Sequence, residues 1–389
     1  MKIAIDGYEA NVPQRLGSSQ VAFELLRHFE KIDRENEYTI FLPEAPMIDL
    51  PKEREGWKYK ILKPKRLWTK IALPLALYTA RQKADVFFSP THYIPRFSPI
   101  KTIATIFDLS FLHFPESFLK KDLWQLTNWT KFSAENTDHI ITISNSSKED
   151  IISSYGIDKN KISVAYAGYD SEKFKVLASR SGQSAKLKVE KMNKVLLRIK
   201  RKYKTGDDYI IYIGTLQPRK NLIRLIEAFA RIEGDLKLVI VGKTTGEGKQ
   251  GWKFQEILET PKKLGVEERV KFLGFVPTED LPYLLSGSLT FTLPSLWEGF
   301  GIPVLEAMAC GIPVIVSNVS SLPEVVGDAG LLVDPYSIDQ IEQAIRTIVS
   351  DKKLGEKYSK AGIEQAKKFS WEKMTRTVIK VFEKVNKNP

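Results

Sequence analysis

Short apolar runs alternate with amphipathic segments along most of the chain. In the N-terminal half the runs predict strands at KIAIDG, YTIFLP, ADVFFSP, TIATIFD, HIITIS and KISVAY, and segments such as QVAFELLRHFEKI show helical spacing between them. The C-terminal half repeats the pattern with YIIYIG, LKLVIVG, RVKFLGF, LTFTL and PVIVS. Strands that alternate with helices in this way predict an α/β protein built on parallel sheets.

The segment LTFTLPSLWEGFGIPVLEAMACGIPVIVS carries two carboxylates around a predicted strand, loop and helix. Pro303 is expected as the first helical residue, and Gly311 as the residue that ends the helix. Glu298 then lies in the loop, and Glu306 lies about one turn inside the helix. A ligand held by the free amides at the helix start could therefore also reach Glu306.

Two loops of the C-terminal half suit an anion. The amides near Phe300 and Gly301 stand at a predicted helix start, where the helix dipole favours a diphosphate. Gly214 ends an earlier strand, and Arg219 and Lys220 follow it at the next helix start, where a guanidinium and an ammonium suit phosphate oxygens. A further strand ends at Gly242. A plain connection with solvated side chains is the alternative at each of these turns, but such turns gather at one edge of a parallel sheet, where α/β proteins bind ligands.

Several motifs of the C-terminal half carry a family resemblance. The E-x7-E pattern EGFGIPVLE, together with GTLQPRKN, VGK, LGFVP, AMACGIPVI and SLPEVVGDAGLLVDP, resembles the retaining GT-B glycosyltransferases of family 4, in their mannosyltransferase-like branch. The likeness runs from about Tyr209 to Ser370, and more loosely through ADVFFSPTHYIP, TIATIFDLSFLHFPE and ITISNSSKEDI. It implies two Rossmann-like domains that face each other across a cleft, with a nucleotide-sugar donor on the C-terminal domain and an acceptor on the N-terminal one.

The resemblance, together with composition, gives the expected domain limits. Residues 1–168 form the N-terminal acceptor domain, 169–208 a basic linker with the leading helix of the second half, and 209–370 the donor domain. The helix predicted within 371–389 returns to the N-terminal domain, as the family implies. A chain of 389 residues is long enough for two domains of ordinary size.

The family also implies a role for each candidate residue. Glu306 would bind the ribose hydroxyls, Glu298 would hold the donor sugar, and the backbone around Val276 would meet the base. The diphosphate, once released, would take the proton of the acceptor. The expected catalytic set is Glu298, Arg219 and Lys220, and the expected donor-binding set is Gly17, Gly214, Gly242, Val276, Phe300, Gly301 and Glu306. Cations replace a metal here, and no cofactor is expected beyond the donor itself; the four histidines also lack ligand spacing.

The chain departs from the family pattern at three places. Phe107 precedes Asp108 where many relatives have a His-Asp pair. Asp108 is therefore a candidate contact to the acceptor or donor sugar, and His92 or His113 could substitute for the family histidine. Thr215 stands where many relatives have an arginine, which leaves Arg219 as its replacement. The first loop, RLGSSQV, retains Gly17 but has serines where the family has a second glycine.

The net charge of +12 is concentrated in two stretches. Residues 175–204 carry a net +10 and residues 57–84 carry +8, so the rest of the chain is acidic. In the first stretch Met192, Val195, Leu196, Ile199 and Tyr203 follow helical spacing; in the second, Trp57, Trp68, Leu73 and Tyr78 alternate with lysines. The second pattern suits an anionic membrane surface, and ordinary solvated faces are the alternative for both. No nucleic-acid motif accompanies the charge, so no nucleic acid is expected.

The family resemblance implies a hexosyltransferase that moves a hexose such as mannose from a nucleotide-diphosphate sugar to a glycan or lipid-linked acceptor in polysaccharide biosynthesis. The chain opens on a strand and contains no long apolar run, so a cytoplasmic protein is expected, with peripheral attachment to the inner face of the cell membrane as the further hypothesis. Three alternatives stay open: a catalytically weak homologue that binds nucleotide-sugar, a glycoside hydrolase that uses the paired carboxylates, and an epimerase.

Overall fold

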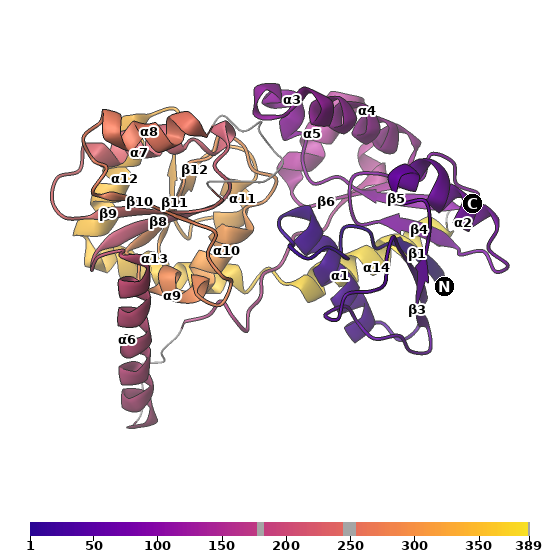
Figure 1. The fold of residues 1–389 in the computed structure, drawn as a ribbon, viewed down its shortest axis with the longest axis horizontal. Coiled ribbons are helices and arrows are strands. Elements are labelled where there is room, and N and C mark those ends of the chain that lie inside the picture. The colour runs from indigo at the N-terminus through magenta and orange to yellow at the C-terminus, as the bar shows by residue number, and fades with distance from the viewer. Residues whose placement is uncertain (177–182, 244–253, 388–389) are drawn as a thin grey trace. The chain divides into compact units, whose positions relative to one another are not determined.

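The computed structural model describes residues 1–176, 183–243 and 254–387 and divides the chain into two compact units (Figure 1). Unit 1 comprises Met1–Leu112, Lys121–Gly168 and Ser370–Pro389, and unit 2 comprises His113–Lys120 and Tyr169–Phe369. Each unit contains one sheet, and every strand pair in both sheets is parallel. The predicted α/β class is therefore confirmed.

The sheet of unit 1 has the strand order β3-β2-β1-β4-β5-β6-β7. Its strands are β1 (Lys2–Asp6), β2 (Glu37–Leu42), β3 (Trp57–Ile61), β4 (Val86–Ser89), β5 (Lys101–Thr105), β6 (His139–Thr142) and β7 (Ile162–Val164). The α-helices are α1 (Ser18–Ile32), α2 (Leu73–Tyr78), α3 (Ser110–His113), α4 (Lys120–Asn136), α5 (Asn145–Tyr155) and α14 (Trp371–Lys387). Shorter helical turns occupy η1 (Lys65–Leu67), η2 (Trp68–Ala72) and η4 (Lys159–Lys161). A further turn, η3 (Pro115–Ser117), lies in the segment His113–Lys120, which belongs to unit 2.

Helices cover both faces of this sheet. The C-terminal helix α14 packs on β4, β5 and β6 and on α1, with the ring of Phe382 5.6 Å from that of Phe29 and 5.2 Å from that of Phe88 (Figure 1). Every residue of β4 and β6 is buried, as expected for central strands of a parallel sheet. The last helix of the chain thus completes the core of the first unit.

The sheet of unit 2 has the order β10-β9-β8-β11-β12-β13. Its strands are β8 (Tyr209–Ile213), β9 (Lys237–Val241), β10 (Val270–Gly274), β11 (Thr290–Leu293), β12 (Val314–Ser317) and β13 (Leu331–Val333). The helices are α6 (Gln183–Tyr203), η5 (Pro218–Lys220), α7 (Leu222–Ala230), α8 (Gln255–Lys263), α9 (Leu281–Ser286), α10 (Ile302–Ala309), α11 (Leu322–Val326), α12 (Ile338–Ser350) and α13 (Lys352–Ala366). Figure 1 shows α7 and α8 on one face of the sheet and α9, α10 and α13 on the other.

The basic stretch 57–84 differs from its predicted structure. Its first part is strand β3, which the apolar pattern did not predict because WKYKI carries two exposed lysines. Lysine on an edge strand protects the sheet from pairing with other chains. Trp57, Trp68 and Leu73, expected on a membrane-facing surface, are buried in the core, and the indole nitrogen of Trp68 donates to Asp6 at 2.9 Å. The prediction that these three side chains face a membrane was wrong.

The basic stretch 175–204 contains the predicted helix, which is α6. Within its apolar stripe Ile199 is buried, and Met192, Val195, Leu196 and Tyr203 are half-buried. The helix packs on α9, and its N-terminal part extends away from the rest of unit 2 (Figure 1). The hydroxyl of Tyr203 donates to Asp280 at 2.6 Å, next to α9. Of the basic residues expected on other faces of this helix, Lys194, Arg198 and Arg201 are exposed, and the side chain of Lys191 lies outside the described residues.

Candidate functional site

The strand order of unit 2 reverses between β8 and β11. Counted from β8, the sheet runs 3-2-1-4-5-6, and β8 and β11 are neighbours whose connections leave toward opposite sides. Loops at the carboxyl ends of two such strands diverge and leave a crevice, which is where open α/β sheets bind their ligands. The two loops at this point are 214–221, after β8, and 294–301, after β11. They contain every residue of the predicted catalytic set.

A buried ion pair joins the two loops. The ammonium Nζ of Lys220 lies 2.6 Å from both Oε1 and Oε2 of Glu298. Ser295 donates its hydroxyl to Oε1 of the same carboxylate at 2.7 Å, and Nη1 of Arg219 is 3.9 Å from Oε2. Lys220 is 9% exposed and Glu298 7%. Two cations and one carboxylate thus form a cluster with one excess positive charge at the crevice.

Further hydrogen bonds fix the shape of this cluster. The guanidinium of Arg219 donates to the carbonyl of Trp297 at 2.8 Å and to the side chain of Gln217 at 3.1 Å. The hydroxyl of Ser320 accepts from the backbone amide of Glu298, and that of Ser321 donates to its carbonyl. The charged groups are therefore held in place before any ligand arrives, which is the arrangement that stabilises developing charge most effectively.

Two predicted glycines bring the loops after β8 and β9 into contact. A Cβ on Gly242 would lie 1.9 Å from the carbonyl oxygen of Gly214, so only glycine fits there. The amide of Gly242 also donates to the carbonyl of Gly274 at 3.0 Å, two residues before the buried Val276. Gly214, Gly242 and Val276 therefore lie along the same edge of the sheet as Lys220.

The helix that carries Glu306 begins one residue earlier than predicted, at Ile302, so Pro303 occupies its second position. Gly301 caps this helix with a φ of 102°, a backbone conformation that favours glycine, and Phe300 before it is buried. Gly311 follows the C-cap, as expected.

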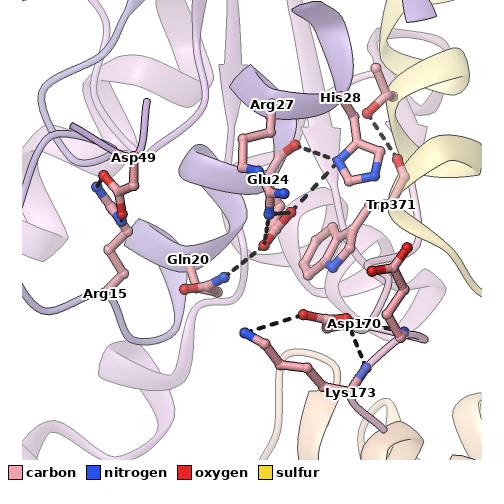
Figure 2. Close-up of polar contacts among 11 residues, drawn as sticks. Arg15, Gln20, Glu24, Arg27, His28, Asp49, Asp170, Lys173 and Trp371 are labelled. Atoms are coloured by element: carbon pink, nitrogen blue, oxygen red, sulfur yellow. Dashed lines mark hydrogen bonds and ion pairs between the residues drawn. The ribbon is translucent and has the colours of Figure 1, made fainter. Parts of the chain in front are cut away.

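Glu306 itself is half-buried among protein atoms. Burial, and next the negative charge of Asp170, raise the pKa of Glu306 to about 8, while Lys173 opposes the shift. Figure 2 shows Asp170 paired with Lys173, 3.4 Å apart. Without a ligand, Glu306 is therefore largely protonated at neutral pH, and a bound cation or hydrogen-bond donor would favour its ionised form.

The remaining predicted residues of unit 1 lie after its strands. Gly17 is the N-cap of α1, with a φ of 57°, and this helix carries the Gln20–Glu24–Arg27 hydrogen bonds of Figure 2. His92 and Asp108 follow β4 and β5, adjacent strands of the first sheet.

His92 occupies the space beside the residue that replaces the family histidine. Its ring centroid is 5.5 Å from that of Phe107, and its Nδ1 is buried with no hydrogen-bond partner among the described residues. Burial lowers the pKa of His92, which the nearby charge of Asp108 opposes. A neutral imidazole with an unsatisfied nitrogen is therefore available at this position.

Trp297 is a residue that the sequence analysis missed. His113, which belongs to unit 2, stacks on the Trp297 indole with ring centroids 4.2 Å apart and an interplanar angle of 23°. The indole Nε1 is buried and has no hydrogen-bond partner within the described parts of the chain. The side chain directly before Glu298 thus presents an unsatisfied hydrogen-bond donor. The sequence could have indicated Trp297 as a candidate site residue, because it lies beside Glu298 in the motif SLWEGFG.

Two Rossmann-like sheets, with a charged cluster at the strand-order reversal of the second, define a protein of the doubly wound α/β class. The model of the group 1 glycosyl transferases matches residues 195–365, and the model of glycosyltransferase family 4 matches residues 16–173. The chain belongs to this glycosyltransferase family, and its fold is GT-B. The family predicted from the motifs is confirmed, and the unmatched residues 174–194 include much of the basic stretch 175–204.

The relatives of this chain include two mannosyltransferases of Escherichia coli. The O-antigen chain mannosyltransferase B of Escherichia coli is 31% identical over 329 residues, which are 83% of this chain and 78% of that protein. The serotype-specific mannosyltransferase WbdA of Escherichia coli is 27% identical over 290 residues, which are 73% of this chain but only 33% of WbdA.

Solved structures share the fold at low identity. Sucrose-phosphate synthase from Thermosynechococcus elongatus superposes with a TM-score of 0.74 and 18% identity, over 99% of this chain and 98% of its own. HepE from Anabaena, determined in complex with UDP and glucose, superposes with a TM-score of 0.72 and is 20% identical. The match covers 99% of this chain and 100% of HepE.

Proposed function

We propose that this glycosyltransferase transfers a hexose, with mannose the favoured sugar, from a nucleotide-diphosphate sugar to a hydroxyl of a glycan or lipid-linked acceptor, with retention of the anomeric configuration. The mannosyltransferase relatives support the sugar. The observation that carries the donor site is the buried Lys220–Glu298 pair at the strand-order reversal of unit 2. This pair supports the proposal because it offers a cation for a leaving diphosphate and a carboxylate that can accept hydrogen bonds from sugar hydroxyls.

The proposed reaction breaks the bond between the anomeric carbon and the phosphate oxygen and forms one between that carbon and the acceptor oxygen. The acceptor approaches from the face that the diphosphate leaves, and its hydroxyl proton passes to the diphosphate. Lys220 and Arg219 stabilise the charge that develops on the leaving group. Glu298 holds the donor sugar, and no protein nucleophile is needed.

The other proposed roles are those that the family resemblance implies. Glu306 accepts hydrogen bonds from the ribose hydroxyls. These hydrogen bonds favour the ionised form of the Glu306 carboxyl, whose pKa burial raises to about 8. The backbone near Val276 meets the base, and the amides of Phe300 and Gly301 contribute to the diphosphate site. Asp108, His92 and His113 are proposed contacts of the transferred sugar or the acceptor. The proposal thus includes mannose as the transferred sugar, contact of the base with the backbone near Val276, and a reaction that needs no metal ion.

The test begins with donor binding. A panel of UDP-, GDP- and ADP-sugars is screened for thermal stabilisation, since a ligand at 100 times its Kd adds about 2.7 kcal/mol to native stability. The stabilising donor is then incubated with glycan and lipid-linked acceptors, and the anomeric configuration of the product is determined. A nucleotide-sugar that binds but is never transferred indicates the weak homologue. Glycan cleavage without any nucleotide-sugar indicates a hydrolase.

A further inference from the structure

The segment Lys65–Tyr78 of unit 1, which spans η1, η2 and α2, is apolar on two opposite faces. On one face Trp68, Ala72, Leu73, Ala76 and Leu77 are buried in a core cluster with Phe87 and Leu62. On the other, four apolar side chains are exposed: Leu67 at 43%, Ile71 at 43%, Leu75 at 56% and Tyr78 at 57%. Because the core covers only one of these faces, the other presents apolar surface that a second apolar environment could bury.

The four exposed side chains share one side of the segment. Their spacing of four, four and three residues is that of a helical stripe, so they form a continuous row rather than scattered exceptions. We call Leu67, Ile71, Leu75 and Tyr78 the outer stripe. The segment is also fixed in place, because the amide of Arg96 donates to the carbonyl of Thr69 and the Trp68 indole donates to Asp6. The outer stripe is therefore a rigid surface.

Basic side chains border the outer stripe. Lys65, Arg66 and Lys70 lie within the same segment and are exposed, and the stretch 57–84 carries eight basic residues and no acidic one. Lys65 pairs with Glu44 at 2.8 Å, and Lys70 lies 5.3 Å from the ring of Trp129, so part of this charge is already in contact with protein groups. Arg66 carries none of the hydrogen bonds or ion pairs identified among the described residues.

We propose that the outer stripe inserts into the interface of an anionic membrane, with the surrounding lysines and arginines on the lipid headgroups. Apolar side chains on one face and basic ones beside them are the combination by which interfacial helices bind anionic lipid. Tyr78 at the end of the stripe suits the headgroup level, because its ring is apolar and its hydroxyl is polar. The residues first expected to make this contact, Trp57, Trp68 and Leu73, cannot do so from the core.

The positive charge around the outer stripe favours anionic lipid over a second copy of this chain as its partner. A symmetric dimer through the outer stripe would bring two stretches of +8 together, and like charges across an interface oppose association. An anionic bilayer neutralises the same charge. The inference goes beyond the proposed function, because it concerns binding to a membrane and not sugar transfer. Its test requires only that the chain binds to vesicles.

The experiment is co-sedimentation with vesicles of phosphatidylcholine alone or mixed equally with phosphatidylglycerol. The wild-type chain should sediment with the anionic vesicles, less with the neutral ones, and less at high salt, because the Debye length falls from about 10 Å at 0.1 M to about 3 Å at 1 M. The double variant Ile71→Ser/Leu75→Ser should partition at least tenfold less onto the anionic vesicles. The control Leu264→Ser/Leu332→Ser removes two apolar side chains of unit 2 that are each 41% exposed, and it should bind like the wild type.

Circular dichroism and melting curves establish that each variant is folded, and stabilisation by a nucleotide-sugar, where one is found, shows an intact donor site. The vesicles contain no sugar acceptor, so the result is independent of whether the proposed transfer reaction is correct. The proposal is overturned if the wild type binds neither vesicle or if Ile71→Ser/Leu75→Ser binds as well as the wild type. It is also overturned if sedimentation in solution shows a dimer that this variant dissociates, which would assign the outer stripe to a second copy.

Discussion

Lys220 and Glu298, 78 positions apart in the sequence, form a buried ion pair in which the ammonium lies 2.6 Å from both carboxylate oxygens. Each group neutralises the other in the absence of a ligand. A diphosphate that enters the crevice would compete for the Lys220 ammonium, and sugar hydroxyls could donate to the carboxylate in turn. The pair therefore keeps both charges in position without leaving either one unpaired inside the protein.

Removal of Lys220 should abolish most activity. Lys220→Ala and Arg219→Ala should each lower turnover by about one to three orders of magnitude, the range found when one preorganised charge-stabilising group is lost. Lys220→Ala also leaves the Glu298 carboxylate buried without its partner, which costs about 3–5 kcal/mol of stability. Steady-state kinetics and chemical denaturation measure the two effects separately.

The double variant Lys220→Met/Glu298→Gln distinguishes catalysis from folding. It replaces the ion pair with neutral groups of similar size, so stability should return to within about 1–2 kcal/mol of the wild type. Activity should stay low. A folded double variant with near-normal turnover would contradict the diphosphate site.

Glu306→Gln should weaken donor binding more than chemistry. Hydrogen bonds to a charged group contribute about 1.5–3 kcal/mol, so donor affinity should fall about tenfold or more, with a smaller change in the rate at saturating donor. Titration calorimetry and single-turnover kinetics separate the two. Unchanged affinity with a collapsed rate would make Glu306 an acid or base and would favour the hydrolase alternative.

The same variant should change the pH dependence of stability. The pKa of Glu306 is about 8 in the folded chain and about 4.3 in the unfolded one. Between these values the unfolded state loses a proton that the folded state keeps, so the stability of the ligand-free chain falls as pH rises through this window. Asp6, whose pKa burial raises to about 7, acts in the same direction.

Melting temperatures measured from about pH 5 to about pH 8 should therefore decline more steeply for the wild type than for Glu306→Gln. The difference should reach at least about 2 °C, since about 1 kcal/mol corresponds to roughly 2–4 °C for a domain of 150–250 residues. Asp6 is unchanged in both chains and cancels in the comparison. Parallel curves would show that Glu306 is ionised in the folded chain.

Trp297→Phe removes the unsatisfied Nε1–H but keeps an aromatic ring beneath His113. If the indole donates to the bound donor or acceptor, kcat/KM should fall about threefold to tenfold, the effect of losing one neutral hydrogen bond. Trp297→Ala, which also removes the stacking, should be worse in both activity and stability. Equal kinetics for Trp297→Phe and the wild type would limit Trp297 to a packing role.

His92→Phe tests the proposed substitute for the family histidine. The change removes an unsatisfied imidazole nitrogen beside Phe107 at little cost in packing. Stability should hold or rise, and transfer should fall about threefold to tenfold with the loss of one hydrogen bond to the sugar or acceptor. The neighbouring Asp108→Asn gives a second measurement at the same strand edge.

Metal chelation should leave transfer unchanged, because the proposed site uses Lys220 and Arg219 as its cations. Turnover is measured with and without EDTA, and then with added magnesium or manganese. Loss of activity in EDTA that a divalent ion restores would show that the cluster needs a metal to stabilise the diphosphate.

The sequence alone determined the α/β class, most of the strands, the family, and the charged residues of the loops after β8 and β11. These depend on local patterns: apolar runs for strands such as Thr290–Leu293, glycine where the backbone must approach closely, as at Gly242, and the E-x7-E spacing that relatives share. It missed strands β3 and β13. In β3, alternating lysines hide the apolar pattern because the strand lies at the edge of the sheet.

Only the tertiary structure decided which side chains meet and which face solvent. The pairing of Lys220 with Glu298 and the stacking of His113 on Trp297 join segments far apart in the chain, and no local pattern specifies such contacts. The segment Lys65–Tyr78 is apolar on both faces, so its sequence could not show that Trp68 and Leu73 enter the core while Ile71 and Leu75 remain outside. The physical reason is that burial depends on the neighbours that the whole fold supplies, whereas periodicity records only the spacing within one element.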